Sequence, residues 1–404
     1  MAITRTIVVA GAGIGGLTAS LALAAQGFRV VVLEKAERLE EAGAGLQLSP
    51  NASRILVELG LQPRLAARAV TPEAINIMSV RTGGEIARLP LGEAASFRAG
   101  APYWVMHRTD LQAALQAEVN DHPDIELRLG CQFEDVTKHA KGLTVVTRSG
   151  MARQHELAAG LIGADGIWSS VRNHLFPGVQ PEFSGLIAWR GTLEATALPR
   201  EYTARSVQLW MGPDAHLVAY PISAARQINV VAIVSGTWNR PGWSVPGDTT
   251  EIKNTFGSAR WPASARMLVG AVDEWRKWAL FTLPDIGEWT ANSVALLGDA
   301  AHAMLPFAAQ GAGMAIEDAA VLAKSLGESV RDGAGENISG IPAALRRYAK
   351  LRRARVLRVQ RLARRQGHIY HLRGPLALAR DLAIKAMGPT QMLARQDWIY
   401  DWRA

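Results

Sequence analysis

The sequence predicts an α/β protein with three parts: a nucleotide-binding domain on a parallel sheet, a second domain on a mixed, mostly antiparallel sheet, and a C-terminal helical segment. Three observations predict this fold class. Residues 6–34 have the pattern of a strand, a glycine turn, a helix and a second strand. Residues 206–235 alternate apolar and polar side chains in short runs. Beyond residue 341 the apolar residues recur at helical spacing.

The first element is a compact β-α-β unit. Residues 6–10 are continuously apolar after Thr6, which predicts a buried parallel strand. A helix rich in alanine and leucine follows from about 14 to 26, and Gly27 ends it. Residues 29–34 form the next strand. The turn between the first strand and the helix reads Gly-Ala-Gly-Ile-Gly-Gly from position 11.

This glycine turn predicts a dinucleotide site. A helix N-terminus offers unpaired N–H groups and partial positive charge to a pyrophosphate, and side chains would block the approach. Gly11 permits the tight turn, Gly13 lets the backbone reach the phosphate, and Gly16 lets the helix pack on the strand. Glu34, at the end of the second strand, is placed to accept hydrogen bonds from ribose hydroxyls. These residues leave the choice between FAD and NAD open.

Two more buried strands are expected at 160–164 and 293–297. The first runs into Asp165 and the second into Asp299. An aspartate in this position caps a helix or binds a ligand, and the residue type alone leaves both open.

The second domain begins where the pattern changes to alternating strands. We expect strands at 206–211, 216–221 and 227–235. His216 and Tyr220 are an even number of residues apart, so they point to the same sheet face.

Helical patterns return from 313 to about 326, from near Pro342, and in a tail that ends in residues 398–402. These patterns give the following division: residues 1–75, 103–180 and 285–340 for the first domain, 76–102 and 181–284 for the second, and 341–404 for the helical segment.

Composition limits the function classes. The single cysteine, Cys131, excludes an intramolecular disulfide and a multi-cysteine metal site, and it fits a reducing cytoplasm. We expect no metal site and no membrane span, and residues 7–25 are better explained by the β-α-β unit than by a signal peptide. Residues 346–365 hold nine arginines, one lysine and no acid. Their helical spacing favours a solvated or domain-bridging helix over a nucleic-acid site.

Two distant motifs decide between the cofactors. Residues 163–172 read Gly-Ala-Asp-Gly-Ile-Trp-Ser-Ser-Val-Arg. Residues 298–302 read Gly-Asp-Ala-Ala-His, and residues 310–319 read Gln-Gly-Ala-Gly-Met-Ala-Ile-Glu-Asp-Ala. With these motifs the chain resembles, over nearly its whole length, the single-component FAD-dependent aromatic hydroxylases. Salicylate hydroxylase, 3-hydroxybenzoate 6-hydroxylase and 6-hydroxynicotinate 3-monooxygenase are members of this family.

The resemblance implies a Rossmann-like FAD-binding domain, a substrate domain, and non-covalent FAD. Asp299 is expected to hold ribityl hydroxyls, Asp165 to serve FAD and the transient nicotinamide, and Val136 to clasp adenine through its backbone. The helix that opens at Gly311 is expected to aim at the flavin's N1–C2=O edge, where reduced flavin carries negative charge. The full set of implied cofactor residues is Gly13, Ile14, Gly15, Gly16, Glu34, Lys35, Gly45, Arg108, Val136, Asp165, Asp299, Gly311, Ala312 and Gly313.

On the substrate side, His216 and Tyr220 are similar to a histidine–tyrosine pair of the family's hydroxybenzoate and hydroxynicotinate enzymes. A base beside the substrate hydroxyl makes a phenolic ring a better nucleophile, and histidine suits neutral pH. A buried histidine–tyrosine pair without chemistry is the alternative. Further implied substrate residues are Arg190, Pro306, Phe307 and Gln310. Phe307 is a departure, because the hydroxynicotinate enzymes carry histidine there; a second polar group is missing or supplied by another position, such as Gln310.

The implied reaction is hydroxylation of a phenolic or hydroxy-heteroaromatic acid with NADH or NADPH and O2, through a C4a-hydroperoxyflavin. Only one dinucleotide fingerprint is present, so the nicotinamide is expected to be a transient co-substrate. The same fold acting on a purine-like ring, an alkene or a polyketide stays open, as does an FAD-dependent oxidase or dehydrogenase without oxygen transfer. The expected partners are a small aromatic substrate and, as an open possibility, a second copy in a homodimer, with no nucleic acid.

Overall fold

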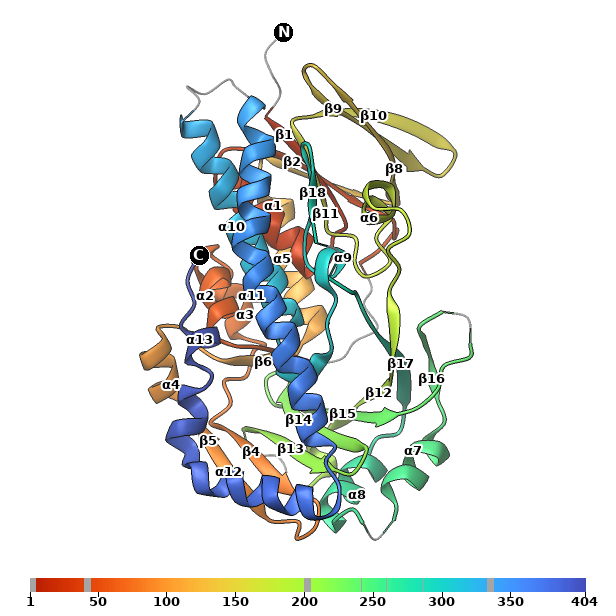
Figure 1. Ribbon diagram of the computed structural model, residues 1–404, viewed down its shortest axis with the longest axis vertical. Coiled ribbons are helices and arrows are strands. Elements are labelled where there is room, and N and C mark those ends of the chain that lie inside the picture. The colour runs from red at the N-terminus through yellow and green to blue at the C-terminus, as the bar shows by residue number, and fades with distance from the viewer. Residues whose placement is uncertain are drawn as a thin grey trace.

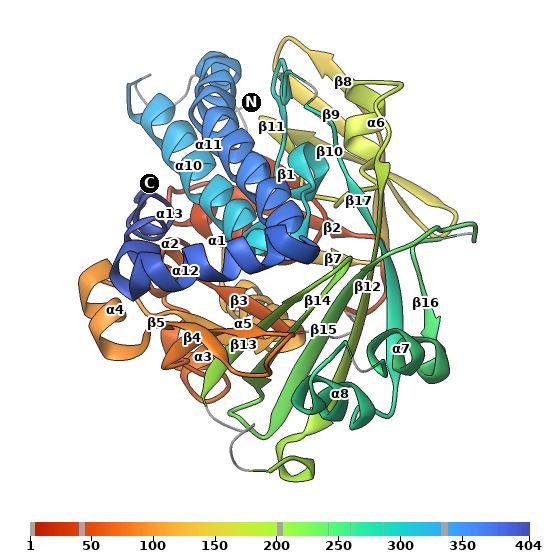
Figure 2. The same cartoon turned by 60° about the horizontal axis from the view of Figure 1, so that its bottom comes forward.

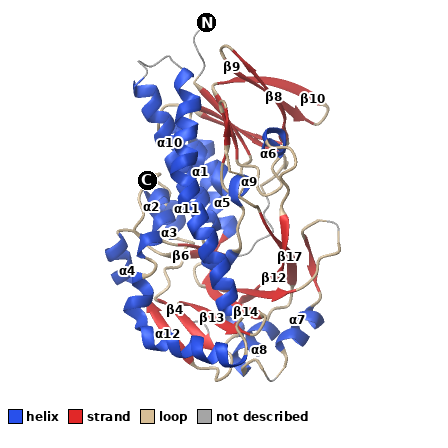
Figure 3. Ribbon diagram, in the orientation of Figure 1, coloured by secondary structure: helices blue, strands red, loops and turns tan. Residues whose placement is uncertain are grey.

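The computed structural model describes residues 5–39, 45–199, 205–240, 242–258, 260–285, 287–332 and 338–404. Two β-sheet regions lie at opposite ends of its long axis, and the long helix α11 (Ile341–Tyr370) runs from one toward the other (Figure 1). In the view coloured by secondary structure, α11 and other long helices lie on the left, and strands lie at the upper right and in the lower part of the molecule (Figure 3). The predicted α/β fold class is confirmed.

The parallel sheet has the strand order β18-β19-β11-β1-β2-β7. Its strands are β1 (Thr6–Ala10), β2 (Arg29–Glu34), β7 (Ile125–Leu129), β11 (Gly160–Gly163), β18 (Thr290–Ala291) and β19 (Val294–Leu296). All neighbours are parallel except the short β18–β19 hairpin. β1 is buried throughout because helices cover one face of this sheet and a second sheet covers the other, which explains its continuous apolar run.

Helices α1 (Ile14–Ala24), α5 (Arg108–Asp121) and α10 (Gly311–Asp332) pack together on one face of the parallel sheet. The opposite face is covered by an antiparallel sheet of β8 (Cys131–His139), β9 (Gly142–Ser149) and β10 (Ala152–Ala158). The smaller elements near this region are β3 (Gly45–Leu48), β6 (Trp104–His107), α2 (Pro50–Glu58), α3 (Gln62–Ala66), α4 (Gly92–Ala99), α6 (Ser170–Leu175) and α9 (Asp299–His302).

The second sheet has eight strands in the order β16-β17-β12-β15-β14-β13-β4-β5. They are β4 (Ala74–Ser79), β5 (Glu85–Pro90), β12 (Glu182–Glu194), β13 (Ser206–Gly212), β14 (Ala215–Ile222), β15 (Gln227–Ser235), β16 (Ser244–Gly247) and β17 (Trp275–Thr282). The pairing is antiparallel except between β13 and β4. The sheet is therefore mixed and mostly antiparallel, as predicted, and β4 and β5 join it from a distant part of the chain.

The two faces of the eight-stranded sheet differ. One face packs on α7 (Thr249–Phe256) and α8 (Ala263–Gly270), two helices that the alternating pattern did not predict, around the buried rings of Trp189 and Trp210. The other face looks toward the end of α11 and α12 (Gly374–Ala394), as the turned view shows (Figure 2). His216 lies on this second face, so the site is expected here.

The basic run of residues 346–365 lies within α11 and bridges the two sheet regions. α11 packs on α10 beside the parallel sheet, where the Tyr348 hydroxyl donates to the Leu296 carbonyl (2.9 Å). Its far end reaches β14 at His371. Of the two expectations for this run, a solvated or a bridging helix, the structure shows the bridging one. No helix among the described residues is long and apolar enough to cross a membrane.

The last part of the chain folds back on the eight-stranded sheet and on α11. α12 is kinked at Gly388 (φ 71°), which precedes Pro389, and it contacts β5. α13 (Asp397–Tyr400) then brings Trp398 and Trp402 against arginines of α11. The tryptophan-rich tail therefore packs on its own chain.

Candidate active site

The acids implied as cofactor ligands meet at one edge of the parallel sheet. Gly11 follows β1, Glu34 ends β2, Asp165 follows β11 and Asp299 follows β19. Because these strands are parallel neighbours, their carboxyl ends lie on the same edge, where α/β sheets bind nucleotides. The structure thus brings together residues that are up to nearly three hundred positions apart in the sequence.

The glycine turn has the shape that a pyrophosphate needs. Gly11 has a φ of 106°, which disfavours any side chain, and a Cβ at Gly16 would lie 1.9 Å from the Gly11 carbonyl oxygen. A Cβ at Gly13 would meet no atom of the described residues within 4 Å, so this backbone is open to a ligand. The Glu34 carboxylate accepts hydrogen bonds from the Ala12 and Ala36 N–H groups (both 2.9 Å), which holds it against the turn. These features fit FAD.

Asp165 caps α6 and retains one unused oxygen. Its Oδ2 accepts from the backbone N–H groups of Ser170 (2.7 Å) and Val171 (3.1 Å), while its buried Oδ1 has no hydrogen-bond partner among the described residues. Burial raises the pKa of Asp165 from its usual value, and these hydrogen bonds oppose the shift. Arg172 is fully buried and donates to the carbonyls of Ile167 and Ala300, so it joins α6 to α9 rather than pairing with Asp165.

Asp299 stands exposed in the first turn of α9, directly after Gly298, whose φ is 62°. This turn is held from behind by Asp318 of α10. The buried Asp318 Oδ2 accepts from the Gly298 N–H (3.0 Å) and contacts His302 Nε2 at 2.6 Å. His302 is therefore a structural residue, and Asp318 positions the predicted ribityl ligand.

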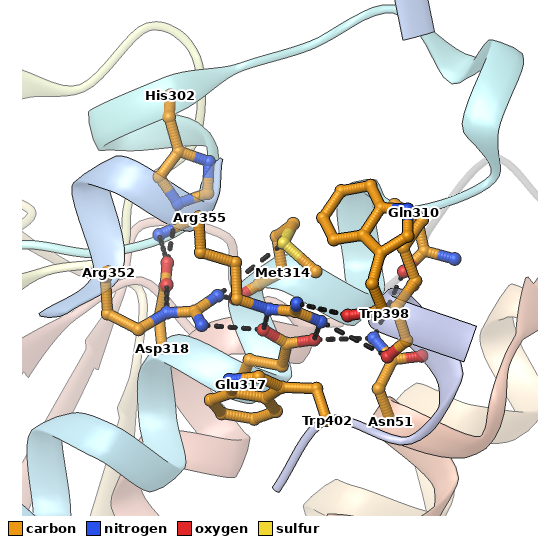
Figure 4. A network of polar contacts seen from close by, with 12 residues as sticks. Asn51, His302, Gln310, Met314, Glu317, Asp318, Arg352, Arg355, Trp398 and Trp402 are labelled. Atoms are coloured by element: carbon orange, nitrogen blue, oxygen red, sulfur yellow. Dashed lines mark hydrogen bonds and ion pairs between the residues drawn. The ribbon is translucent and has the colours of Figure 1, made fainter. Parts of the chain in front are cut away.

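A buried ion network connects α10 to α11 (Figure 4). Arg352 donates to Glu317 (2.6 Å) and to Asp318 (2.7 Å), and all three side chains are at most 1% exposed. Arg355 adds a two-pronged contact to Glu317 (2.6 and 2.7 Å). The Trp402 ring lies near both guanidinium groups, 5.0 and 4.9 Å from its centroid. Two arginines of the basic run thus balance two buried carboxylates.

The network continues to the start of α10 through neutral side chains. Asn51 donates to Glu317 (2.6 Å) and to Gln310 (3.1 Å), and Gln310 donates to the Ser49 hydroxyl (2.8 Å). Gln310 is 3% exposed and its amide is engaged at both ends. These contacts give Gln310 a structural role, and the hypothesis that it supplies a second polar group to the substrate stays a prediction. Its amide fixes the turn before Gly311, since Ser49 and Asn51 hold it from α2.

The segment that opens β3 meets the eight-stranded sheet at Gly45. Its N–H donates to Asn229 Oδ1 (2.7 Å), and a Cβ on Gly45 would lie 2.6 Å from the Tyr220 ring. Gly45, one of the implied cofactor residues, therefore lies against the predicted catalytic tyrosine. Asn229 is fully buried on β15 opposite Tyr220, and in the part of the chain that the structure describes its Nδ2 has no hydrogen-bond partner. Sequence reasoning missed Asn229, because nothing in its strand pattern separates it from a core polar residue.

Arg190 lies on the same sheet face as these residues. It pairs across the strands with Val231 of β15, and its guanidinium lies 5.4 Å from the Trp278 ring centroid. Burial raises the pKa of Tyr220 above its usual range, and the positive charge of Arg190 opposes that shift. Tyr220 is thus a protonated phenol at neutral pH, suited to donate a hydrogen bond rather than to act as a base.

His216 belongs to a separate aromatic cluster on this face. Its ring centroid lies 5.1 Å from Phe307, 5.4 Å from Tyr370 and 5.1 Å from His371. His216 and Tyr220 are four positions apart along β14, which places their Cα atoms roughly 13 Å apart. They therefore do not act as a contacting pair, and each occupies one end of the same sheet face. Phe307 is fixed by α11, where a Cβ on Gly367 would lie 2.7 Å from its ring.

The other predicted residues lie around the same crevice. Gly311 opens α10, after Ala309 in a left-handed conformation (φ 51°) and the short 3-10 helix Pro306–Ala308. Arg108 opens α5, next to His107, which pairs with Gly45 across β3 and β6. The remaining predicted positions are Ile14, Gly15, Ala312 and Gly313 at the two helix starts, exposed Lys35 after β2, and Val136 in β8, whose N–H donates to Asp135 Oδ1.

Comparison with known proteins agrees with this geometry. A family model described as an FAD binding domain matches residues 4–363. The 3-amino-4-hydroxybenzoate 2-monooxygenase of Streptomyces platensis is 37% identical over 400 residues, covering 98% of this chain and 96% of that protein. The 3-hydroxybenzoate 6-hydroxylase of Polaromonas naphthalenivorans is 34% identical, covering 98% and 96%. This chain belongs to the FAD-dependent aromatic hydroxylases.

A solved salicylate hydroxylase substrate complex has a TM-score of 0.82 and 27% identity, and the match covers 99% of this chain and 96% of that one. The expected family, the flavoprotein class and the cofactor FAD are confirmed. The chain is an FAD-dependent monooxygenase, and the open alternative of an oxidase without oxygen transfer is not supported.

Proposed function

We propose that this hydroxylase takes electrons from NADH or NADPH, uses O2, and hydroxylates a phenolic or hydroxy-heteroaromatic acid. The observation that carries the proposal is one sheet face that holds the basic residue Arg190 and the polar residues His216 and Tyr220. Arg190 on β12 is level with Val218, midway between His216 and Tyr220 on β14, and β15 lies between the two strands. A small aromatic acid between them can reach the guanidinium with its carboxylate and one end group with its hydroxyl. Relatives named for hydroxybenzoates support this choice of substrate class.

FAD, when bound, supplies the electron transfer and the oxygen activation. The residues proposed to hold it are the glycine turn with Glu34, the aspartates 165 and 299, and the start of α10. The partial positive charge at the N-terminus of α10 favours negative charge on a group placed before it. Asp318 and Gln310 fix the two turns that carry this site, so the donors are positioned before a ligand arrives.

His216 is proposed as the base that takes the proton of the substrate hydroxyl. Burial and the neighbouring His371 lower the pKa of His216 well below its usual value, so the ring is neutral at pH 7 and has a lone pair to accept a proton. Tyr220 and Asn229 are proposed to orient substrate by hydrogen bonds. Phe307 and Tyr370 enclose the His216 end and keep water away from it.

A panel of aromatic acids tests the proposal. Purified holoenzyme is mixed with NADH or NADPH and with 3-hydroxybenzoate, 3-amino-4-hydroxybenzoate, salicylate or 6-hydroxynicotinate. We expect at least one acid to accelerate nicotinamide oxidation strongly and to gain one oxygen atom, seen as a mass increase that carries the label when ¹⁸O2 is supplied. Benzoate and nicotinate, which lack the hydroxyl, are the matched controls. Equal oxidation rates with every acid and unlabelled products would contradict the proposal.

We also propose that the enzyme acts in the cytoplasm, where Cys131 remains a buried thiol, and that it forms a homodimer. The exposed leucines of α12, Leu376, Leu378 and Leu382, support a contact between copies, which a native mass spectrum tests.

A further inference from the structure

A second imidazole lies beside the proposed base. His371 is the residue that ends α11, and its Nε2 lies 2.8 Å from Nδ1 of His216. His216 is 2% exposed, whereas His371 is half-buried, so the two rings lead from the interior toward the surface. No sequence motif joins positions 216 and 371.

The position of His371 is fixed by the chain around it. Arg380 of α12 is 7% exposed and donates to the carbonyl oxygens of Ile369 (3.1 Å) and Tyr370 (3.0 Å), directly before His371. Arg373, directly after this turn, pairs with Asp214 in the β13–β14 connection. The turn is therefore attached to the eight-stranded sheet on both sides of His371, and the ring is held against His216.

The short contact requires one proton between the rings. A nitrogen–nitrogen distance of 2.8 Å is a hydrogen bond, and in a pair of neutral imidazoles one ring must donate its N–H to the lone pair of the other. Burial lowers the pKa of His371 to about 4, with Asp214 opposing the shift and His368 and Arg380 adding to it. Since burial also lowers the pKa of His216, both rings are neutral at pH 7.

The groups around the pair leave the surface end of His371 as the exit for a proton. Phe307 and Tyr370 pack on the inner ring, and burial raises the pKa of Tyr370 to about 12, so it stays protonated. The charged groups near the outer ring are Asp214 and Arg373, which pair with each other, Arg380, and His368, whose Nδ1 contacts the Arg364 carbonyl. Asp214 is about half exposed, and its negative charge favours the protonated form of His371.

We propose that His371 is the positioning and relay residue of the hydroxylation site, which holds Nδ1 of His216 and passes the substrate proton to solvent. The inference rests on the proposed function, in which His216 is the base. The substrate O–H gives its proton to Nε2 of His216, Nδ1–H of His216 passes to Nε2 of His371, and Nδ1–H of His371 leaves to water. One proton enters and one leaves, and no electrons move. Because Phe307 is apolar, a second polar group must come from another position. His371 is that group, since it brings a second imidazole to His216 from another element.

Three matched variants test the relay, each prepared as holoenzyme and checked for FAD absorbance. They are His216→Gln, His371→Gln and, as control, His368→Gln, one turn earlier on α11. Proton release on mixing with 3-hydroxybenzoate, or with the best acid of the panel, is followed by stopped flow with a pH indicator, alongside the pH profile of coupled turnover. We expect His371→Gln to slow proton release and turnover by about tenfold or more, and His368→Gln to match wild type.

A second substitution at His371 distinguishes a relay from a merely structural role. His371→Ala leaves space at the half-exposed position, and we expect added imidazole to restore part of its turnover in proportion to concentration, with no effect on wild type. The relay is refuted if His371→Gln matches His368→Gln in proton release and pH profile, or if imidazole restores nothing while FAD binding is intact. If His216→Gln also behaves like wild type, the proposed base itself is wrong, which is a distinguishable result.

Discussion

The two faces of α11 use the same residue type in opposite ways. Arg352 on the inner face is 1% exposed and joins two fully buried carboxylates of α10. Its neighbour Arg353 on the outer face is 39% exposed and pairs with Asp285, which is 35% exposed. Both contacts are short, and a list of ion pairs would treat them alike. In such a basic run, the role of each arginine depends on what its helix face packs against, and the number of charges alone does not distinguish a scaffold from a solvated surface.

The energetic consequence of this difference is large. An exposed pair gains little because water screens it and two long side chains lose freedom. A buried pair has already lost its hydration, so removing one partner leaves an uncompensated charge in the interior. The inner pair also has a positioning role, because Asp318 holds the Gly298 N–H and Glu317 is linked through Asn51 to Gln310.

The largest expected effect is that of Arg352→Met. The change leaves Glu317 with Arg355 and Asp318 with His302, so the two carboxylates keep part of their partners. We expect a loss of about 3 kcal/mol in the free energy of unfolding. We also expect a lower affinity for FAD, because both turns of the cofactor site depend on the network. Urea unfolding and fluorescence titration of the apoprotein with FAD measure the two effects.

Arg352→Lys is the matched control for this change. It keeps the charge but loses the forked geometry that reaches two carboxylates, so its loss is expected to be intermediate. A loss below about 1 kcal/mol for Arg352→Met would contradict the view that the inner face is a scaffold.

The pH dependence of stability gives the next largest effect. Burial alone would raise the pKa of Asp318, but the charges and hydrogen bonds of His302 and Arg352 lower it to about 2. A carboxyl whose pKa is lower in the folded state stabilises the fold above its unfolded pKa, and this stability is lost as the pH falls toward the folded pKa. We expect about 2–3 kcal/mol to be lost between roughly pH 4 and pH 2.

Asp318→Asn isolates this contribution. Its stability difference from wild type is expected to shrink as the pH falls from 4 to 2, in urea unfolding curves taken at each pH. Hydrogen bonds from Arg353 also lower the pKa of Asp285, but solvent screens that outer pair. Asp285→Asn is therefore expected to show a much smaller change over the same window, and equal changes for both variants would remove the distinction between the faces.

The same contrast explains how much the sequence predicts. The sequence predicted the glycine turn, the place of Glu34 and the strand ends at Asp165 and Asp299, because backbone geometry and contiguous residues define them. The fold class followed from the same local patterns. The division into domains and the roles of the individual site residues stay proposals, since they depend on ligands and on long-range packing.

The parts that the sequence did not predict are built from side chains far apart in the chain. Asn51 meets Glu317 and Gln310, and His216 meets His371, through contacts that span more than 150 positions. Gln310 was assigned to the substrate because its neighbours form a motif, yet its amide is engaged by Ser49 and Asn51. Local patterns carry no information on which of two facing surfaces a polar side chain joins, so they did not predict the contacts of Gln310 with Ser49 and Asn51.

The smallest expected effect is that of Arg353→Ala. Arg353 contacts Asp285 with two hydrogen bonds, at 3.0 and 2.6 Å, so its geometry is as good as that of the buried pair. Because both groups are exposed, we expect Arg353→Ala to change the free energy of unfolding by about 0–1 kcal/mol, and by less in high salt, where the pair is screened. Urea unfolding of wild type and variant at low and high ionic strength measures this. A loss comparable to that of Arg352→Met would mean that good ion-pair geometry outweighs burial in this helix, and the division of α11 into an inner scaffold and an outer solvated face would have to be abandoned.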